Sequence, residues 1–387
     1  MRWKPYDLNE YSEPWKIRWF FWVFSAVLIL LVCFFGQRYW AGGWDGESFT
    51  FWHETQNTLL GVLLVIFVLR LGVYYKQKIY YDAWLEKCER TEAHYKAWAN
   101  RHLVCFASFT QFPGKLNPRT WLSHREQLEQ FIDQALPIEF IEKDNELKSA
   151  FHYAVDGVLA ELKEINRHYP VRCHVILNIS EKDYPSNRYH EAFFKSLLEE
   201  RLGNKGKPLI IELHPVKSDF SLFTPMFQNS VEEAHLLIVL QLGQSEQVSD
   251  ALASYLLILG EYHVHKPILP GKAKFYRPQL IRENEISHDM NKFLTLLPQA
   301  QAKMPLIQSA QVNEHAQAIY SYLFNAQSMP TELSVLSAYT GTLGRLSDLL
   351  TLGFLLEIAE ATPKQLLLAN AFEPEGYLGY IEQMKAH

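Results

Sequence analysis

Two long apolar segments lie near the N-terminus of the sequence. Residues 19–36, WFFWVFSAVLILLVCFFG, include no charged side chain, and a helix of this length nearly crosses a hydrocarbon core of ~30 Å. Residues 55–75 contain LLGVLLVIFVL and a single charge, Arg70, close enough to the end to reach the lipid headgroups. The first run ends in bulky residues rather than in a small-residue cleavage site, which argues against a signal peptide. We therefore predict two membrane-spanning helices joined by a short loop.

The charges around these segments predict their orientation. Cations flank the pair on the outside, at Arg2, Lys4, Lys16, Arg18, Arg70, Lys76 and Lys78. The loop between the segments has Arg38 alone, beside the acidic residues Asp45, Glu47 and Glu54. Cytoplasmic loops carry the excess of Lys and Arg in membrane proteins. Both termini and the main domain are therefore expected in the cytoplasm.

The rest of the chain alternates apolar runs with amphipathic segments. Residues 79–101 have helical spacing and predict a stalk helix that continues the second span, after a hairpin at 1–78. Strands are predicted at 103–108, 173–179, 208–215, 234–243 and 264–269, and helices at 144–167, 190–202 and 248–259. Near-continuous apolar strands between such helices are typical of an α/β fold with a mixed or parallel sheet. Residues 102–387 are thus predicted to form one α/β domain or two packed halves.

Composition excludes one class of partner. The net charge is -6 at pH 7, and no long stripe of Lys and Arg runs along the sequence. Proteins that bind nucleic acid need such cations to neutralise phosphates. We therefore expect no nucleic-acid partner.

The cysteines and histidines offer no metal-ligating motif by their spacing. The four cysteines, Cys33, Cys88, Cys105 and Cys173, lie far apart. Among the histidines the one close pair is His263 and His265, which would share a face of a short strand. Such a pair can bind a metal if a third ligand joins it, but packed or solvated histidines are more common. The sequence therefore predicts no metal, no cofactor and no catalytic residue.

A glycine-containing turn precedes the most apolar segment of the C-terminal half. In TGTLGRLSDLLTLGFLLEIAEA, Gly341 and Gly344 open a predicted buried helix, a position that can bind an anion. The segment lacks GxGxxG and also lacks the Lys-Ser/Thr pair of a P-loop. Close packing of the helix against a sheet is therefore the favoured interpretation.

This glycine turn, the Leu-rich helix and the strand-like LLLAN at 366–370 together resemble the C-terminal end of thiolase-like condensing enzymes. The resemblance implies a catalytic histidine after the first glycine of the turn, where this chain has Thr342. It also implies a cysteine at a sharp strand-to-helix turn, whereas Cys105 and Cys173 lie in strand-like runs. A thiolase-like domain without the family's chemistry is therefore expected.

The overall layout also resembles the bacterial adaptor proteins that bring a lipase effector to the type VI secretion spike. That resemblance implies a non-enzymatic adaptor in the bacterial inner membrane, with the bilayer, an effector and a spike protein as partners. The alternative is a membrane-bound enzyme that acts on lipid or acyl substrates. The observation that would favour this alternative is Cys105 or Cys173 within hydrogen-bond reach of a histidine such as His174 or His235 in an open pocket.

Overall fold

The protein is described here from a computed structural model that covers residues 1–387. The structure describes residues 13–40, 46–113, 116, 118, 121, 128–131, 134–139, 141, 146–178, 191–203, 206–214, 220–228, 231–242, 248–301, 306–310, 314–326, 332–362, 366–369 and 375–384. Contacts divide the chain into two compact units, residues 5–95 and residues 96–387 with the first four residues. We call the second unit the globular domain.

The first unit contains the two predicted spans. Helix α1 is Trp19–Trp40, and helix α2, Gly46–Ala99, continues without a break into the segment predicted as a stalk. Both helices are long and apolar enough to cross a membrane, and their most apolar windows are 11% and 0% buried in the protein. A core helix of a soluble domain would be mostly buried, so the exposed apolar surface fits a lipid environment. The proposed limits at residues 78 and 101 stay a prediction.

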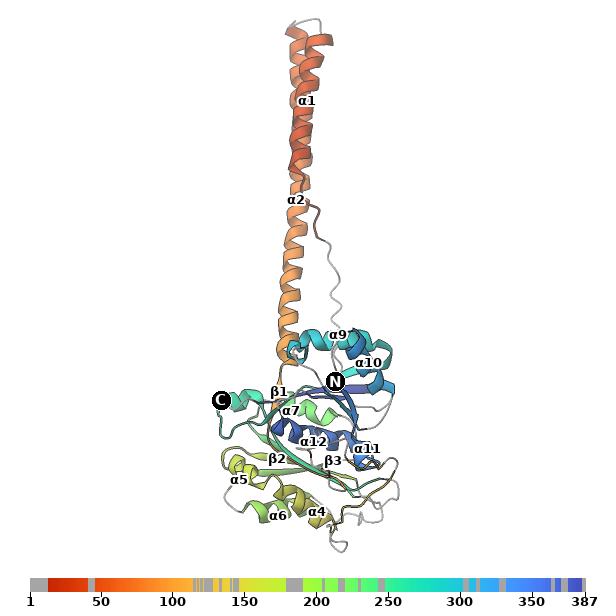
Figure 1. The fold of residues 1–387 in the computed structure, drawn as a ribbon. Helices are drawn as coiled ribbons and strands as arrows, with labels where there is room; N and C mark the ends of the chain where they lie inside the picture. Colours follow the sequence, from red (N-terminus) through yellow and green to blue (C-terminus); the bar gives the residue numbers. More distant parts are fainter. Residues whose placement is uncertain are drawn as a thin grey trace. The chain divides into compact units, whose positions relative to one another are not determined.

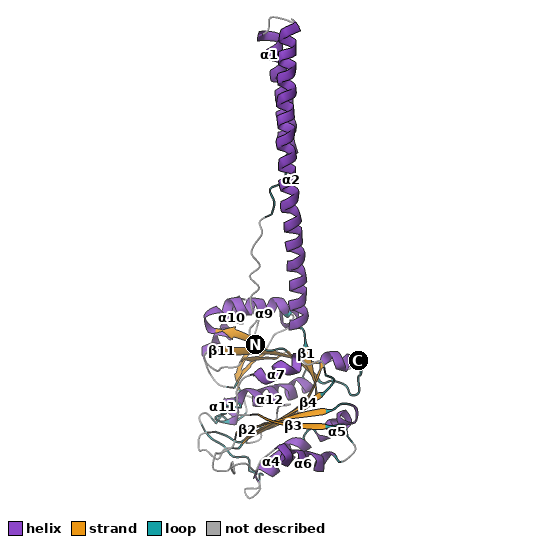
Figure 2. Ribbon diagram, turned by 180° about the vertical axis from the view of Figure 1, so that it is seen from behind, coloured by secondary structure: helices purple, strands orange, loops and turns teal. Residues whose placement is uncertain are grey.

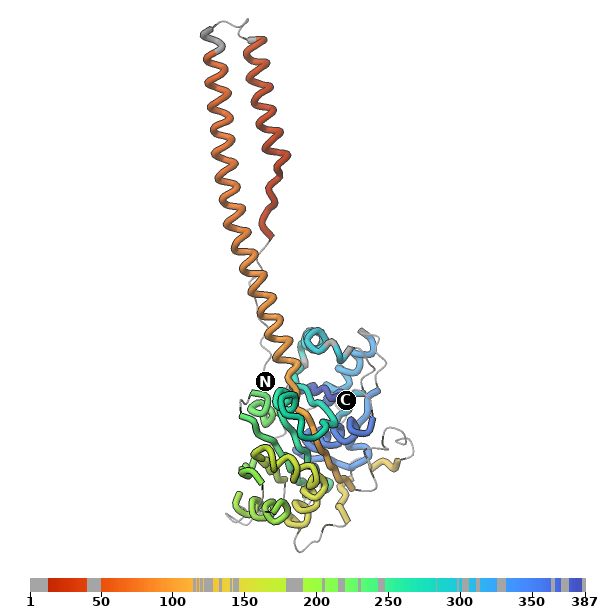
Figure 3. Tube along the Cα trace, turned by 90° about the vertical axis from the view of Figure 1, so that its left-hand side faces the viewer, coloured from red at the N-terminus to blue at the C-terminus, as the bar shows by residue number. Residues whose placement is uncertain are grey.

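Helices α1 and α2 lie side by side in this unit (Figure 3). The ring of Phe67 on α2 contacts both Trp19 and Trp22 of α1, with ring centroids 5.3 and 5.1 Å away. Gly36 of α1 faces Trp52 of α2 so closely that an added Cβ would lie 2.7 Å from the indole. Small residues permit such close approach between membrane helices, so these contacts hold α1 and α2 together as a hairpin.

The globular domain is built on one 11-stranded mixed sheet (Figure 1). Its strands are β1 (His102–Gln111), β2 (Val171–Asn178), β3 (Leu209–His214), β4 (Ala234–Gln241), β5 (Ala251–Leu259), β6 (Ala273–Tyr276), β7 (Gln279–Arg282), β8 (Leu306–Ser309), β9 (Glu332–Val335), β10 (Leu366–Ala369) and β11 (Glu375–Gln383). The spatial order is β3-β2-β4-β5-β1-β6-β11-β10-β8-β9, and β7 pairs with β11.

This order contains the same pattern twice. In the first part, β2 pairs in parallel with β3 and β4, and β5 joins β4 and β1 in antiparallel fashion. In the second part, β8 pairs in parallel with β9 and β10, and β11 joins β10 and β6 in antiparallel fashion. The two parts meet where β1 pairs with β6. The sheet therefore has an internal two-fold repeat, although no repeat is visible in the sequence.

Helices cover the sheet in layers (Figures 1 and 2). Helices α4 (Glu146–Asp156), α5 (Leu159–His168) and α6 (Glu191–Leu202) cover the outer face of the first part. Helices α9 (Ile286–Leu296) and α10 (Glu314–Ala326) cover the outer face of the second part. Between the two parts lie the short helix α7 (Phe223–Gln228) and helix α12 (Ser347–Ala361). Three buried hydrophobic clusters fill the spaces between these layers.

Helix α12 is the buried helix that the sequence predicted after the glycine turn. Twelve of its residues are buried, because sheet lies on both sides of it. Its acidic residue Glu357 accepts hydrogen bonds from the backbone N–H and the hydroxyl of Thr110 on β1, at 3.0 and 2.8 Å. These bonds compensate for the partial burial of a carboxylate.

The prediction of a helix at 248–259 is wrong, because residues 251–259 form strand β5. All nine residues of this strand are buried, on both faces of the sheet. A strand that is covered on both faces has apolar residues at every position, and periodicity then cannot separate it from a buried helix. Here the pairing with β4 and β1 decides the conformation.

Two further predictions need correction. The strand predicted at 264–269 is absent, because residues Gly260–His265 form the short helix α8 and no strand follows at once. The single helix predicted at 144–167 is two helices, α4 and α5, which separate at Gly157. At that glycine an added Cβ would lie 2.2 Å from Cγ of Phe109. The approach of β1 therefore requires glycine at this position.

Candidate functional site

Three histidines that are distant in sequence meet on one face of the first part of the sheet. In the parallel register of β2 and β3, His174 lies opposite Glu212, and Ile176 lies opposite His214. In the register of β2 and β4, Arg172 lies opposite His235. Side chains two residues apart on a strand point to the same face. The register therefore gathers these polar groups into one cluster of Arg172, His174, Glu212, His214, Glu233 and His235.

The three imidazoles form a line across β3, β2 and β4. Nδ1 of His174 lies 2.9 Å from Nε2 of His214, and Nε2 of His174 lies 3.1 Å from Nδ1 of His235. Neighbouring rings are stacked or tilted, with centroids 5.1 and 5.4 Å apart. His174 therefore connects the other two histidines through both of its ring nitrogens.

Two glutamates flank the line of histidines, and Arg172 joins them. The Nε and Nη2 groups of Arg172 donate to the two carboxylate oxygens of Glu233 at 3.0 and 3.1 Å, and its Nη1 group donates to Oε1 of Glu212. The other oxygen of Glu212, Oε2, lies 3.4 Å from Nδ1 of His174 and 3.7 Å from Nε2 of His214. A bidentate guanidinium holds a carboxylate in a fixed orientation, so Arg172 fixes Glu233, whereas its single hydrogen bond to Oε1 of Glu212 leaves Oε2 of that residue to face the histidines.

The cluster is buried at one end and open at the other. His174 and His235 are 3% and 4% exposed, whereas the side chains of His214 and Glu212 on the edge strand β3 are 27% and 35% exposed. Burial lowers the pKa of His174 to about 2, and the neighbouring histidines and Arg172 add to this effect. Burial also lowers the pKa of His235, to about 4, against the opposing effect of Glu233. All of these imidazoles are therefore neutral near pH 7.

We assign the protons of the ring nitrogens from the position of the buried Glu233 carboxylate. Nε2 of His235 lies 3.9 Å from Oε1 of Glu233, and an N–H on this atom is favoured beside the negative charge. Nδ1 of His235 is then an acceptor, and the N–H at Nε2 of His174 donates to it. In this arrangement Nδ1 of His174 keeps a lone pair directed at the open end, between His214 and Glu212. A neutral imidazole of this kind can accept a proton or bind a cation.

None of the four cysteines lies in this cluster. Cys33 and Cys88 belong to helices α1 and α2. Cys105 and Cys173 are fully buried in β1 and β2, and burial raises the pKa of both thiols well above the usual value. The thiol of Cys105 donates to the carbonyl of Ala107 at 3.3 Å. Cys173 packs in the cluster of α4 to α6, on the sheet face opposite His174. Thiolate chemistry is therefore disfavoured at both positions.

The glycine turn serves packing. Gly341 has φ +75°, and an added Cβ would lie 2.4 Å from the carbonyl oxygen of Gln134. The backbone N–H of Thr342 donates to that same carbonyl at 2.8 Å, and the carbonyl of Thr342 accepts from the N–H of Ser249 at 2.8 Å. The N–H of Thr342 is therefore used inside the protein, which supports the packing interpretation over an anion site.

The structure also places the His263 and His265 pair. Both lie on helix α8 rather than on a strand, and the ring of His263 contacts Phe106. Burial lowers the pKa of His263. The pair does not join the cluster on β2, β3 and β4.

A sequence signal for the cluster exists, although the sequence analysis missed it. A charged residue precedes a histidine by two positions on three successive strands, as Arg172-x-His174, Glu212-x-His214 and Glu233-x-His235. Each pair shares one strand face, so the recurrence predicts a common polar face once the strands are known to be neighbours.

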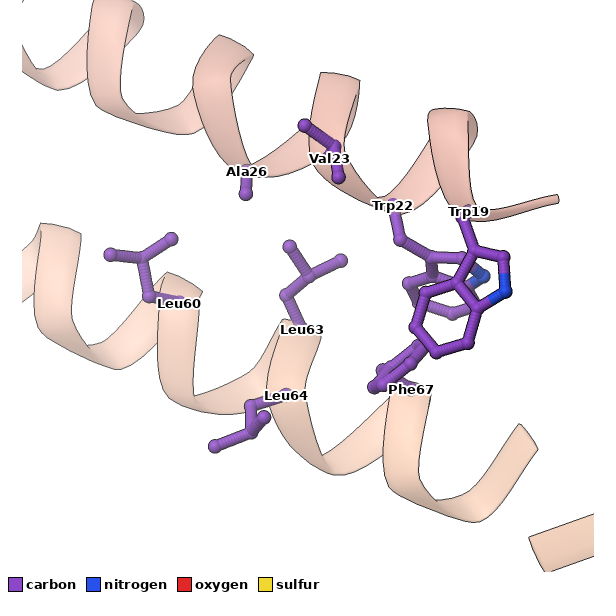
Figure 4. A pocket seen from close by; sticks show the side chains of 8 residues that line it. All are labelled: Trp19, Trp22, Val23, Ala26, Leu60, Leu63, Leu64 and Phe67. Atoms are coloured by element: carbon purple, nitrogen blue, oxygen red, sulfur yellow. The ribbon is translucent and has the colours of Figure 1, made fainter. Parts of the chain in front are cut away.

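A second feature lies in the helical hairpin (Figure 4). A cavity of about 300 Å³ between α1 and α2 is lined almost entirely by carbon, from Trp19, Trp22, Val23, Ala26, Leu60, Leu63, Leu64 and Phe67. No titratable side chain lines it. The cavity therefore suits a hydrocarbon chain and not a chemical step.

Comparison by sequence finds no matching family model and no matching curated protein. Comparison of structures finds a ketosynthase complex of a type II polyketide synthase, with its acyl-carrier protein and a bound hexaketide. The TM-score is 0.52 at 8% identity, over 73% of this chain and 99% of that chain. Ketosynthase twelve of the bacillaene polyketide synthase of Bacillus amyloliquefaciens matches with a TM-score of 0.51 and 11% identity, over 74% of this chain and 73% of that chain. The domain has a thiolase-like fold. The resemblance read from the turn, helix and strand at 340–370 is thus confirmed for the fold.

The same comparison corrects the functional prediction. The sequence analysis led us to expect a non-enzymatic adaptor of type VI secretion. The matching structures are ketosynthases, so the comparison supports the thiolase-like fold and does not support the adaptor identity. The adaptor interpretation depended on the overall layout of the chain and on the absence of the family's cysteine and histidine from their expected positions. It overlooked the histidine cluster, because His214 and His235 lie 40 and 61 residues after His174 in sequence.

Proposed function

We propose that this protein is a membrane-anchored enzyme that cleaves acyl esters or thioesters, and that the cluster on β2, β3 and β4 carries out the reaction. The observation that carries the proposal is the line of three neutral histidines beside two glutamates, open to solvent at β3. The thiolase-like fold supports the substrate class, because the ketosynthase complex is described with a bound hexaketide and an acyl-carrier protein.

The anchor supports the same substrate class. Helices α1 and α2 are apolar enough to span a bilayer, and they bring the chain to the surface where acyl chains are concentrated. The flanking cations favour the cytoplasmic side of a bacterial inner membrane for the globular domain. Acyl thioesters made in the cytoplasm and lipids of the inner leaflet are both within reach of such a domain.

The chemistry proposed is transfer of an acyl group to water. A water molecule attacks the acyl carbon, a C–O bond forms, and the bond between that carbon and the leaving sulfur or oxygen breaks. The proton of the attacking water goes first to the carboxylate of Glu212 and then to the leaving group, so that acid and alcohol or thiol result. Condensation through a cysteine acyl-enzyme is not proposed, because Cys105 and Cys173 are buried.

The experiment uses the full chain in lipid nanodiscs with acyl-coenzyme A thioesters of several chain lengths and with phospholipid. Free fatty acid is measured by mass spectrometry and released thiol by a chromogenic reagent. We expect hydrolysis of at least one substrate and a loss of ~100-fold or more in kcat/KM for Glu212→Gln and His214→Ala. These side chains are partly exposed, so their replacement should leave folding intact.

Cys173→Ala is the matched control, because Cys173 lies beside His174 on β2 but points to the other face. It should keep full activity at equal thermal stability. Absence of acyl cleavage with every substrate, or loss of activity in Cys173→Ala with full activity in Glu212→Gln, would overturn the proposal.

A further inference from the structure

We propose that His174, Glu212 and His214 form a binding site for a divalent transition metal, with Zn²⁺ as the ion that fits best. The inference deepens the proposed function, on which its catalytic meaning rests: an ion held by these side chains would itself activate the attacking water, because its ligand atoms would no longer be free to accept a proton. Metal binding itself is measurable without any substrate.

The first support is the geometry of the three donor atoms. Nδ1 of His174, Nε2 of His214 and Oε2 of Glu212 form a triangle with sides of 2.9, 3.4 and 3.7 Å. Donors at 2.0–2.1 Å from a tetrahedral ion are about 3.3 Å apart, whereas donors at right angles around an octahedral ion are about 3.0 Å apart. The observed sides lie around the tetrahedral value. These three atoms are therefore close enough to share one ion once the rings of His174 and His214, whose nitrogens face each other, turn toward it.

The second support is the ligand set. Two imidazoles and one carboxylate match the donors that bind zinc in catalytic sites, where a water molecule occupies the fourth position. Glu212 and His214 lie on the edge strand β3 and are partly exposed, so the fourth position would face solvent. The site would thus be open to an incoming substrate rather than closed as in a structural zinc site.

The third support is the set of groups behind the ligands. The N–H at Nε2 of His174 is directed at His235, and His235 is directed at Glu233. Arg172 holds Oε1 of Glu212, which leaves Oε2 directed at the histidines. Ligating histidines usually donate their second N–H to such a partner, and ligating carboxylates are usually hydrogen-bonded. The cluster has both arrangements before any ion is present.

Binding would require one change of proton position. Without an ion, Nε2 of His214 donates its N–H to Nδ1 of His174, and with an ion both atoms must offer lone pairs. His214 would therefore move its proton to Nδ1, which a partly exposed ring can do through water. His174 keeps the same tautomer in both states.

The first experiment titrates Zn²⁺ into the chelator-treated full chain in detergent, in competition with a chromophoric chelator. We expect one tight site per chain. Glu212→Gln and His214→Ala should each weaken binding by ~10-fold or more, and His235→Phe, which removes a group behind the ligands, by ~10–100-fold. The matched control is the double change His263→Ala and His265→Ala on α8, which removes two histidines outside the cluster and should leave the affinity unchanged.

The second experiment replaces Zn²⁺ by Co²⁺ and records the visible spectrum. Strong d–d absorption that Glu212→Gln abolishes would support a tetrahedral site. Weak absorption typical of six-coordinate Co²⁺ would overturn the tetrahedral assignment. Equal zinc affinity in the wild type, Glu212→Gln and His214→Ala, or loss of binding in the α8 control, would overturn the site. Acyl cleavage that persists in a protein free of metal would remove the catalytic role, and tight zinc binding without acyl cleavage would remove only the proposed reaction.

Discussion

The guanidinium of Arg277 lies 4.2 Å from the centre of the Trp98 ring and stacks the end of β6 on the last turn of α2. A second ring, that of Phe227, lies 5.1 Å from the same group. The side chain is 1% exposed, and its three nitrogens find no hydrogen-bond acceptor within the described ranges. Burial, together with the nearby Arg101, lowers its pKa to about 10. Two aromatic faces thus stabilise a buried charge that would otherwise be costly.

This arrangement predicts an unusual order of stabilities at position 277. Arg277→Met keeps the volume and removes the buried charge, so the free energy of unfolding should stay within ~1 kcal/mol of the wild type. Arg277→Lys should be less stable than Arg277→Met, because an ammonium is more strongly hydrated and stacks poorly. Thermal unfolding of the full chain in detergent measures both. A Lys variant as stable as the wild type would contradict the stacking argument.

The carboxyl of Asp289 on α9 should make the stability of the second part of the sheet depend on pH. Burial alone would raise the pKa of its carboxyl, but hydrogen bonds from the side chain and backbone N–H of Arg282, at 2.9–3.0 Å, outweigh burial and lower it. A carboxyl whose pKa is lower in the folded state stabilises the folded protein at pH values above its unfolded pKa of 3.8. This contribution to the free energy of unfolding is lost as the pH falls through the folded-state pKa.

Asp289→Asn should therefore reduce the free energy of unfolding at pH 7 by ~1–3 kcal/mol. Below pH 3.8 the difference in free energy of unfolding between the variant and the wild type should become smaller. Unfolding curves at several pH values between 7 and 3 test this. A gap that stays constant over the whole range would mean that the Arg282 pair does not shift the carboxyl.

Gly203 and Gly341 have the same φ of +75°, so their alanine variants distinguish the cost of backbone strain from the cost of steric crowding. At Gly203, after α6, an added Cβ meets nothing within 4 Å, so Gly203→Ala should cost ~1 kcal/mol for conformation alone. At Gly341 the added Cβ would also meet the carbonyl of Gln134 at 2.4 Å and the hydroxyl of Ser249 at 2.6 Å.

Gly341→Ala should therefore destabilise by ~2–4 kcal/mol, clearly more than Gly203→Ala. Both variants are compared by thermal unfolding under one condition. Equal destabilisation would indicate that the segment around Gln134 moves aside without cost.

The orientation of the hairpin is tested with reporter fusions. A reporter active in the cytoplasm alone should be active when fused after the last residue and inactive when inserted into the loop near residue 43. The reverse pattern would place the globular domain outside the cytoplasm and exclude cytoplasmic acyl thioesters as substrates.

The cluster of histidines and glutamates illustrates the limit of sequence reasoning in this chain. His214 and His235 lie 40 and 61 residues after His174, and each looks like an isolated histidine at the edge of an apolar run. Their proximity depends on the order β3-β2-β4 and on the parallel register, and both follow from the packing of helices between the strands. The adaptor interpretation considered cysteines as the candidate nucleophiles, whereas the polar groups that these strands bring together are histidines and glutamates.

The sequence by itself determined the features that depend on local composition. Residues 19–36 have no charge and form the apolar helix α1, a candidate membrane span, and the apolar segment after Gly344 had to be buried, as α12 is. Tertiary structure alone decided that residues 251–259 are a strand and that the two parts of the sheet repeat one order. It also decided that three histidines share one face. A segment in which every residue is apolar has no hydrophobic periodicity, so its sequence does not distinguish a strand from a helix. A contact between distant strands depends on the free energy of the whole packed sheet and not on local sequence.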